Sequence, residues 1–262
     1  MEKLIITKIG GKVIDHTEDL NKFLEDFTKI PNKKMLIHGG GNIATQIAQS
    51  MGIQPNLIDG RRITDSEMLE VVVMVYAGLV NKKIVSKLQA FGTNALGLSG
   101  ADANIITAKK REVKDIDYGF VGDIEKINSQ QIVYFLNERI VPIIAPLTHD
   151  QQGNILNTNA DTVAAILATA LSQHFQTELF YCIDQPGLLK SLSNPNSIIN
   201  KITWEKYQKY KLEGTVSEGM IPKMDTAFSA LRSGVSRINI CHANALLNVV
   251  KGNPKVGSEL SI

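Results

Sequence analysis

Short apolar runs alternate with longer amphipathic stretches through the first half of the chain. The runs "LIITKIG", "KMLIHGG" and "RIVPIIAPL" are largely apolar and rich in branched residues. Such runs are typical of strands buried on both faces of a parallel sheet. Helical spacing follows at residues 20–29, from residue 42 onward, at 65–90 and at 129–138. The alternation predicts an α/β protein with an open, mainly parallel central sheet between two layers of helices, a three-layer αβα sandwich.

The helical stretch at 65–90 is the longest of these patterns. Thr64 or Asp65 is its expected N-cap, and its polar side is expected to carry Asn81, Lys82 and Lys83. The segments "NALGLSG" and "ANIITAKKREV" after it read as strands, followed by a polar, turn-rich connection through residues 118–123.

The second half of the chain repeats the pattern. "THDQQGNIL" predicts a hairpin, "NADTVAAILATAL" a buried helix, and "TELFYCID" and "VSRINICHA" two further strands. Helices are predicted between these strands in "ITWEKYQKYKLEG" and around Pro222, a residue that a first helical turn tolerates. We place a lobe boundary between Leu147 and Thr177. It divides one continuous sheet into an N-terminal lobe, residues 1–170, and a C-terminal lobe, residues 171–262.

Composition narrows the function classes. The 262 residues include 28 basic and 26 acidic side chains, a formal net charge of +2, so no global field indicates a nucleic-acid or anionic-membrane binder. Cys182 and Cys241 lie in apolar runs, which favours reduced core thiols. The N-terminal apolar run is too short for a signal peptide or a membrane span. We therefore expect a cytoplasmic protein without membrane or nucleic-acid partners.

Glycines follow the first two predicted strands, in "KIGGK" and "HGGGN". A strand that ends in glycines and leads into a helix directs free backbone N–H groups and the positive end of the helix dipole at one point, which suits an anion. Either turn alone could be only a tight connection. Parallel strands open at the same edge, so the two turns together are expected to line one crevice. Neither turn matches a dinucleotide or P-loop signature.

Two lysines stand where a cation is unexpected. Lys8 interrupts an apolar strand, and an anion that it neutralises explains it better than a side chain reaching solvent. Lys223 lies near a predicted helix N-terminus, where the helix dipole disfavours a cation, so a phosphate or an acidic group should be close unless the lysine is simply solvated.

Asparagines and an arginine complete the candidate site. Asn157 and Asn159 would point their amides to the same side of an extended chain, with Asp161 in the following helical turn. Helix capping explains only one of the two asparagines. In "DGRRIT", Arg61 and Arg62 lie next to a turn glycine, where a guanidinium fork could hold a carboxylate, or the two could be only a surface pair. His38 reads as a packed residue rather than a catalytic one.

The set is rich in fixed positive donors and poor in acid–base groups. Such a set suits phosphoryl transfer, where positioning and charge neutralisation supply most of the catalysis. In order and spacing, "KIGGK", "HGGGN", "GRRIT", "GLSGAD", "NTNAD", "DQPGLL" and "SEGMIPKM" resemble the amino acid kinase family, and within it the acetylglutamate kinases. The resemblance covers essentially the whole chain.

The resemblance implies ATP-dependent phosphorylation of the γ-carboxylate of N-acetyl-L-glutamate, which yields N-acetyl-L-glutamyl 5-phosphate. It implies that Lys8 and Lys223 stabilise the transferring phosphoryl group and that Asp161 orients both lysines. By the same resemblance the backbone N–H groups of the glycine turns meet the reacting oxygens, and the N-terminal lobe binds the acylglutamate. The residues implied on that side are Gly40, Gly41, Arg62, Asn157 and Asn159.

The resemblance places ATP, carrying Mg²⁺ on its phosphates, in the C-terminal lobe, with no metal bound by the protein itself. The residues implied to bind the nucleotide are Gly10 and Gly11 after the first strand and, in the C-terminal lobe, Asp184, Gly187, Gly219 and Met220. It also implies a homodimer built on the N-terminal lobe, and a first strand near Leu4 leads us to expect an arginine-insensitive dimer. "GLSGADAN" departs from the common family sequence, so N-succinyl-L-glutamate stays an alternative substrate. A catalytically silent amino-acid or nucleotide sensor is the alternative from another class.

Overall fold

The computed structural model describes residues 1–58, 61–191, 193–194, 197–216 and 218–262. Within these residues the main sheet has eight strands in the order β12-β14-β13-β11-β1-β2-β8-β5. All neighbouring pairs are parallel except β13 and β14, which confirms the open, mainly parallel sheet. The strands are β1 (Lys3–Ile9), β2 (Lys33–His38), β5 (Ala95–Leu98), β8 (Val141–Ile144), β11 (Gln176–Ile183), β12 (Lys201–Thr203), β13 (Arg237–His242) and β14 (Ser258–Ser261).

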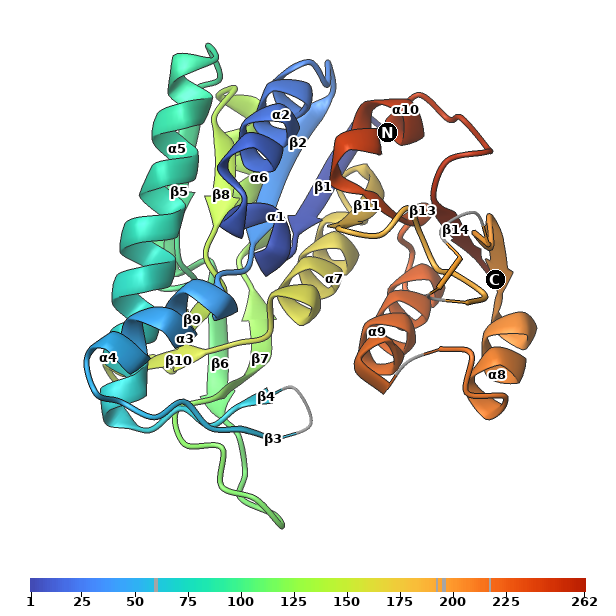
Figure 1. Ribbon diagram of the computed structural model, residues 1–262. Coiled ribbons are helices and arrows are strands. Elements are labelled where there is room, and N and C mark those ends of the chain that lie inside the picture. Colours follow the sequence, from blue (N-terminus) through green and yellow to red (C-terminus); the bar gives the residue numbers. More distant parts are fainter. Residues whose placement is uncertain (59–60, 192, 195–196, 217) are drawn as a thin grey trace.

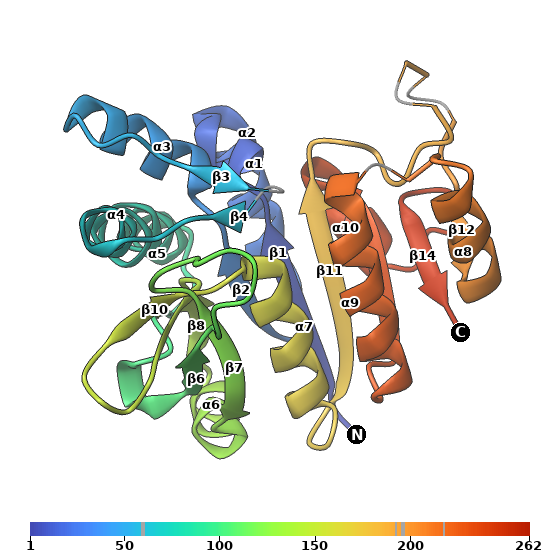
Figure 2. The same ribbon diagram turned by 90° about the horizontal axis from the view of Figure 1, so that it is seen from below.

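Helices cover both faces of the main sheet, as the sandwich prediction requires (Figures 1 and 2). Leu4 and Ile6 of β1 face one core and Ile5 and Ile9 face the other, because successive strand side chains alternate. The first core lies under α6 (Ser129–Asn137), α7 (Ala160–Leu171), α8 (Trp204–Leu212) and α9 (Ile221–Arg232). The second lies under α1 (Gly11–Asp15), α2 (Thr17–Thr28), α3 (Gly41–Ser50), α4 (Ser66–Val73), α5 (Asn81–Ala90) and α10 (Leu246–Val250).

The long helix is interrupted. Between α4 and α5 the backbone forms a π-helical segment, Met74–Val80. Asp65 is the N-cap, because its carboxylate accepts a hydrogen bond of 2.8 Å from the N–H of Met68. The expected polar side is wrong at Asn81, which is only 1% exposed. Its amide donates to His38 Nε2 at 3.1 Å and to the carbonyl of Ile143 at 2.9 Å.

A smaller sheet and a two-stranded hairpin complete the N-terminal half. The sheet has the order β10-β9-β6-β7, with β6 (Ile106–Lys110), β7 (Gly122–Ile127), β9 (Leu147–His149) and β10 (Ile155–Asn157), and the hairpin pairs β3 (Leu57–Ile58) with β4 (Arg61–Arg62). The predicted hairpin is confirmed as β9 and β10. The connection expected at residues 118–123 overlaps the start of β7. β7 is an edge strand, and its two adjacent exposed residues, Glu125 and Lys126, break the alternation that would have predicted a strand.

The C-terminal half contains a strand that the sequence analysis missed. Strand β14 runs antiparallel to β13, and its four residues are too few to give a clear pattern. Cys182 on β11 and Cys241 on β13 are neighbours in the strand register. Both are buried free thiols, as expected. Of the helices formed by the described residues, none combines the length and the apolar character needed to cross a membrane.

Candidate active site

Three charged side chains from distant parts of the chain meet beside the carboxyl end of β1. Lys8 Nζ lies 2.8 Å from Asp161 Oδ1, and Lys223 Nζ donates a hydrogen bond of 2.6 Å to Asp161 Oδ2. The side chains of both lysines are 9% exposed and that of Asp161 is 20% exposed. Asp161 lies in the first turn of α7 and Lys223 in the first turn of α9, and the two helices run side by side in Figure 2. We call these three residues the lysine cluster.

The lysine cluster has one more positive than negative charge. Burial raises the pKa of Asp161, but the charges of Lys8 and Lys223 outweigh burial and hold that pKa well below its usual range. Burial and the charge of Lys8 lower the pKa of Lys223 to about 8, against the opposing attraction of Asp161. Asp161 is therefore ionised at neutral pH. The remaining positive charge, together with two helix N-termini, favours an anion at this position.

Tyr181 belongs to this site and was missed by the sequence analysis. It lies on β11 directly beside Lys8 in the strand register, with no exposed surface. Its hydroxyl donates to the backbone carbonyl of Asp161 at 3.3 Å, and Lys223 Nζ lies 5.1 Å from the centre of its ring. The sequence held one signal of this role, a tyrosine within an apolar strand. A buried hydroxyl needs a hydrogen-bond partner, so a polar neighbour could have been expected.

The first glycine turn is open on its side-chain side. Gly10 has a φ of −80°, and a Cβ there would meet only the carbonyl of Cys182 at 3.9 Å. That carbonyl already accepts the Gly10 N–H at 3.2 Å, so this N–H has a partner within the chain, and its contact with a ligand oxygen stays a prediction. Gly11 begins α1, and the N–H groups of a first helical turn have no helical acceptor.

The second glycine turn is crowded. Gly40 has a φ of 155°, and a Cβ there would lie 3.0 Å from the Tyr76 ring and 3.5 Å from Val80. Tyr76 and Val80 both belong to the π-helical segment. We expected the glycine here to admit an anion. The positive φ and the close contact with Tyr76 favour a glycine at this position whether or not an anion binds.

Arg62 is buried beside the second turn. It is 9% exposed, whereas its neighbour Arg61 is exposed, so the alternative of a surface pair is wrong. Its Nη2 donates to the carbonyl of Gly41 at 2.9 Å and to Thr45 Oγ1 at 2.7 Å. These bonds fix the guanidinium at the start of α3. The turn residue before Arg61, at position 60, lies outside the described residues.

The two asparagines have different surroundings. Asn159 is exposed and caps α7, because its Oδ1 accepts from the N–H groups of Asp161 at 2.9 Å and Thr162 at 3.1 Å. Asn157 is buried at the end of β10, where its amide donates to Thr64 Oγ1 at 3.0 Å. The two amides therefore do not share one environment, contrary to the expectation. Capping accounts for Asn159, and Asn157 joins β10 to the segment that carries Arg62.

His38 is a packed residue, as expected. It has no exposed surface, its Nδ1 lies 2.7 Å from the carbonyl of Gly39, and burial lowers its pKa to about 4. The amide of Asn81 meets its other nitrogen. The neutral ring thus supports the strand end that leads into the second glycine turn.

The residues expected to bind the nucleotide do not form one contact network. Asp184 pairs with Lys12 at 2.8 Å, and both line a cavity of about 240 Å³ next to His16 and His242. Gly187 is buried, and a Cβ there would lie 2.6 Å from Ser258 Oγ, so packing alone requires this glycine. Gly219 is exposed with open space around its Cα, and Met220 directly precedes α9.

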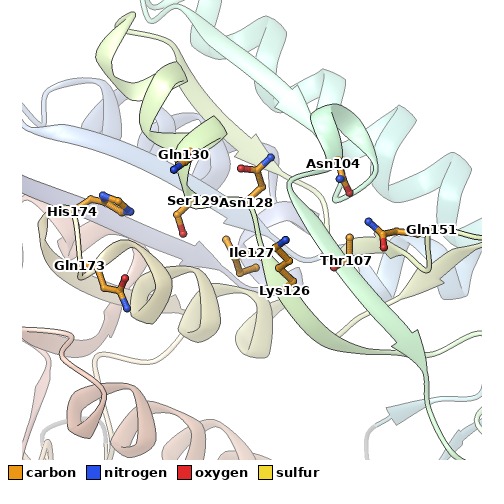
Figure 3. Close-up of a pocket in the computed structure, with 10 residues that line it drawn as sticks. All are labelled: Asn104, Thr107, Lys126, Ile127, Asn128, Ser129, Gln130, Gln151, Gln173 and His174. Atoms are coloured by element: carbon orange, nitrogen blue, oxygen red, sulfur yellow. The ribbon is translucent and has the colours of Figure 1, made fainter.

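A second cavity, of about 530 Å³, lies between the start of α6, the β9–β10 hairpin and the end of α7 (Figure 3). Its lining is mainly amide and hydroxyl side chains: Asn104, Thr107, Lys126, Ile127, Asn128, Ser129, Gln130, Gln151, Gln173 and His174. No residue of the lysine cluster lines it. The buried charges, and not the volume of this cavity, therefore make the lysine cluster the candidate reactive site.

Comparison with known proteins agrees with this geometry. The chain is similar to the acetylglutamate kinase of Cytophaga hutchinsonii, with 48% identity over 261 residues and 99% of each chain covered. It is 49% identical over 245 residues to the acetylglutamate kinase of Bacteroides fragilis, which covers 94% of each chain.

Solved structures share the fold. One from Streptococcus mutans has a TM-score of 0.78 at 27% identity and covers 91% of this chain and 94% of its own. Carbamate kinase of Giardia lamblia bound to AMP-PNP has a TM-score of 0.69 at 13% identity and covers 99% of this chain and 98% of its own, which shows the fold alone. The amino acid kinase family matches residues 3–242, and the chain belongs to that family.

Proposed function

We propose that this protein is an acetylglutamate kinase, which transfers the γ-phosphoryl group of ATP to the γ-carboxylate of N-acetyl-L-glutamate. The product is the acyl phosphate N-acetyl-L-glutamyl 5-phosphate, in the direction of arginine biosynthesis. The single observation that carries the proposal is the lysine cluster, in which two buried ammonium groups share one carboxylate. The similarity to curated acetylglutamate kinases over nearly the whole chain supports the choice of substrate.

In this proposal Lys8 and Lys223 neutralise the charge that repels one anion from another. A carboxylate and a γ-phosphate must approach closely although both are negative, and ammonium groups held in a poorly hydrated site stabilise the oxygens between them. Asp161 keeps the two ammonium groups together and takes up no proton, because its pKa is far below neutrality. Lys8 contacts the phosphoryl oxygens from the side of β1, and Lys223 contacts them from the side of α9.

The amino-acid end of the substrate is assigned to the region around Arg62. A guanidinium can hold the α-carboxylate through two hydrogen bonds, and Arg62 is anchored rigidly enough to serve this role. Arg62 contacts Gly41 directly, and Asn157 binds Thr64, two residues after Arg62. We assign Gly41 and Asn157 to the same substrate. Asn159 contributes through the start of α7, and Gly40 through the shape of the turn.

ATP is assigned to the C-terminal lobe, residues 171–262, and the acylglutamate to the N-terminal lobe, residues 1–170. Gly11 and the first turns of α1 and α9 offer N–H groups to the phosphates, and Gly219 leaves open space beside α9. We assign Mg²⁺ to the ATP phosphates, because both oxygens of Asp161 already face lysines. The proposal includes a homodimer built on the N-terminal lobe and a cytoplasmic location.

A substrate panel tests the proposal. The wild-type protein is incubated with ATP, Mg²⁺ and N-acetyl-L-glutamate, N-succinyl-L-glutamate or L-glutamate, and the acyl phosphate is trapped as a hydroxamate while ADP release is followed. We expect the highest kcat/KM with N-acetyl-L-glutamate. A higher kcat/KM with N-succinyl-L-glutamate would show that the substrate carries a succinyl group and not an acetyl group. Absence of hydroxamate with all three would favour a silent sensor of the same fold.

A further inference from the structure

Tyr181 occupies an unusual place for a tyrosine in an apolar strand. Its neighbours in the β11 sequence, Phe180 and Cys182, point to the opposite core, whereas Tyr181 points to the core that contains α7 and α9. The strand register sets it beside Lys8, and its side chain also contacts Asp161 and Lys223. It is thus in contact with, or adjacent to, each member of the lysine cluster.

The ring of Tyr181 offers Lys223 a favourable surface. Lys223 lies in the first turn of α9, where the helix dipole repels a cation, and 8% of the residue is exposed, so that water compensates little. An ammonium group at 5.1 Å from a ring centre is attracted by the negative face of the ring, and the attraction is largest at desolvated sites. The ring therefore favours the charged form of Lys223 and fixes its position.

The hydroxyl of Tyr181 has a separate role. It donates to the backbone carbonyl of Asp161, in the first turn of α7. Burial and the nearby charge of Asp161 raise the pKa of Tyr181 well above its usual value, so the hydroxyl keeps its proton and remains a donor. The bond restrains the backbone that places the Asp161 carboxylate between the two lysines.

We propose that Tyr181 is a positioning residue for phosphoryl transfer: its ring supports the Lys223 ammonium, and its hydroxyl anchors Asp161. This inference rests on the proposed function for its effect on turnover. Its effect on Lys223 itself does not depend on that function. Tyr181 acts through Lys223 and Asp161.

Two variants separate the roles of ring and hydroxyl. Tyr181→Phe keeps the ring and removes the donor, and Tyr181→Leu removes both. Phe180→Leu is the matched control: Phe180 is equally buried on the same strand and also has a cation over its ring, Arg237 at 5.7 Å, but it faces the other core. All three variants are first compared with the wild type in thermal unfolding, which measures the cost of a smaller side chain.

The decisive readout is the titration of Lys223 in the free protein, followed by NMR of ¹³C-methylated lysines and assigned with Lys223→Arg. The charged and ionisable groups that face Lys223 in the described structure are Lys8 on β1, Asp161 on α7 and Tyr181 on β11. We expect Lys223 to titrate at lower pH in Tyr181→Leu than in the wild type, and at nearly unchanged pH in Tyr181→Phe and Phe180→Leu.

The kinetic readout is kcat with N-acetyl-L-glutamate and ATP. We expect kcat to fall about tenfold in Tyr181→Leu and about threefold in Tyr181→Phe, with KM changed less than about twofold. An unchanged Lys223 titration in Tyr181→Leu, or a Phe180→Leu variant that loses as much kcat, overturns the inference. If the wild type forms no acyl phosphate, the proposed function fails, and the NMR titration still decides the role of Tyr181.

Discussion

The two glycine turns have nearly the same sequence pattern but different structures. After β1, Gly10 has an ordinary negative φ and a Cβ there would have room. After β2, Gly40 has a φ of 155° and a Cβ there would press on the ring of Tyr76. The chain itself thus requires a glycine at the second turn. At the first turn the chain would tolerate a larger residue, and the open space lies at the end of the strand that carries Lys8.

The two turns show that a glycine can occur for two different reasons, which the sequence alone does not distinguish. A glycine can be required by the fold, or it can keep space for a ligand. Within the site, substituting the first kind changes stability and activity together, whereas substituting the second kind changes activity alone. The two turns can therefore be distinguished by measuring both properties in the same variants.

Among the substitutions at the glycine turns and the asparagines, Gly40→Ala is expected to have the largest effect. The strained backbone and the contact with Tyr76 should destabilise the protein by about 1–3 kcal/mol, and turnover should fall about a hundredfold as the turn moves. Denaturant unfolding and the hydroxamate assay measure the two losses. Gly52→Ala is the control, since Gly52 has a φ of 80° but open space around it, and it should lose stability without losing kcat/KM.

A double variant sharpens this prediction. Adding Tyr76→Ala to Gly40→Ala removes the ring that the new methyl group contacts. The contact explanation predicts that the two stability changes are not additive, so that the double variant loses less stability than the sum of the two single losses. Strict additivity would show that backbone strain at Gly40 alone is responsible.

Gly11→Ala should give the opposite signature at the first turn. A Cβ at Gly11 would meet only the side chain of Asn42, at 3.7 Å, so unfolding should change by no more than about 0.5 kcal/mol. The methyl group would stand where we place the nucleotide phosphates, and kcat/KM for ATP should fall about tenfold. A stable variant with wild-type kcat/KM would mean that no ligand approaches this turn.

The lysine cluster beyond the first turn should give a pH signature. Lys223 supports transfer only when protonated, and its pKa of about 8 in the free protein lies within the working range. Because the charged form is the acid form, kcat/KM should be level below pH 7 and fall as the pH rises through 8, to about a tenth of its plateau at pH 9. Gly11→Ala should retain this profile at a lower plateau, and an activity that rises through pH 8 would contradict the role of Lys223.

The smallest effects are expected at Asn157 and Asn159, which also contrast a residue explained by the fold with one assigned to the substrate. Asn159 is explained by the chain, since it caps α7. Asn159→Ala should therefore cost about 1 kcal/mol of stability and raise KM for N-acetyl-L-glutamate only slightly, through the loosened start of α7. Asn159→Asp retains the cap and should restore stability. A KM that rises strongly in both variants would place the Asn159 amide on the substrate.

Much of the fold and the centre of the site could be predicted from the sequence. The shared open edge of parallel strands predicted that the two glycine turns would line one crevice. The resemblance to the amino acid kinases, and not the strand pattern, implied that Lys8, Asp161 and Lys223 meet. All three do so.

The contacts that the sequence did not reveal depend on precise geometry. Tyr76 contacts Gly40 from a π-helical segment that the hydrophobic periodicity does not predict. Asn81, directly after that segment, points into the core. Tyr181 meets the lysine cluster because of the register between β1 and β11. Periodicity predicts which face of an element is buried, but neither a local change of helical pitch nor the register of distant strands.

The most direct test of the account is the transfer of ³²P from [γ-³²P]ATP to N-acetyl-L-glutamate in a single turnover, compared between the wild type and Lys8→Met and Lys223→Met. Each protein is used in excess over [γ-³²P]ATP and with saturating N-acetyl-L-glutamate, after circular dichroism has shown that it is folded. The account predicts labelled acyl phosphate with the wild type and a rate at least about a thousandfold lower with either variant. A folded variant that transfers the label at close to the wild-type rate would contradict it.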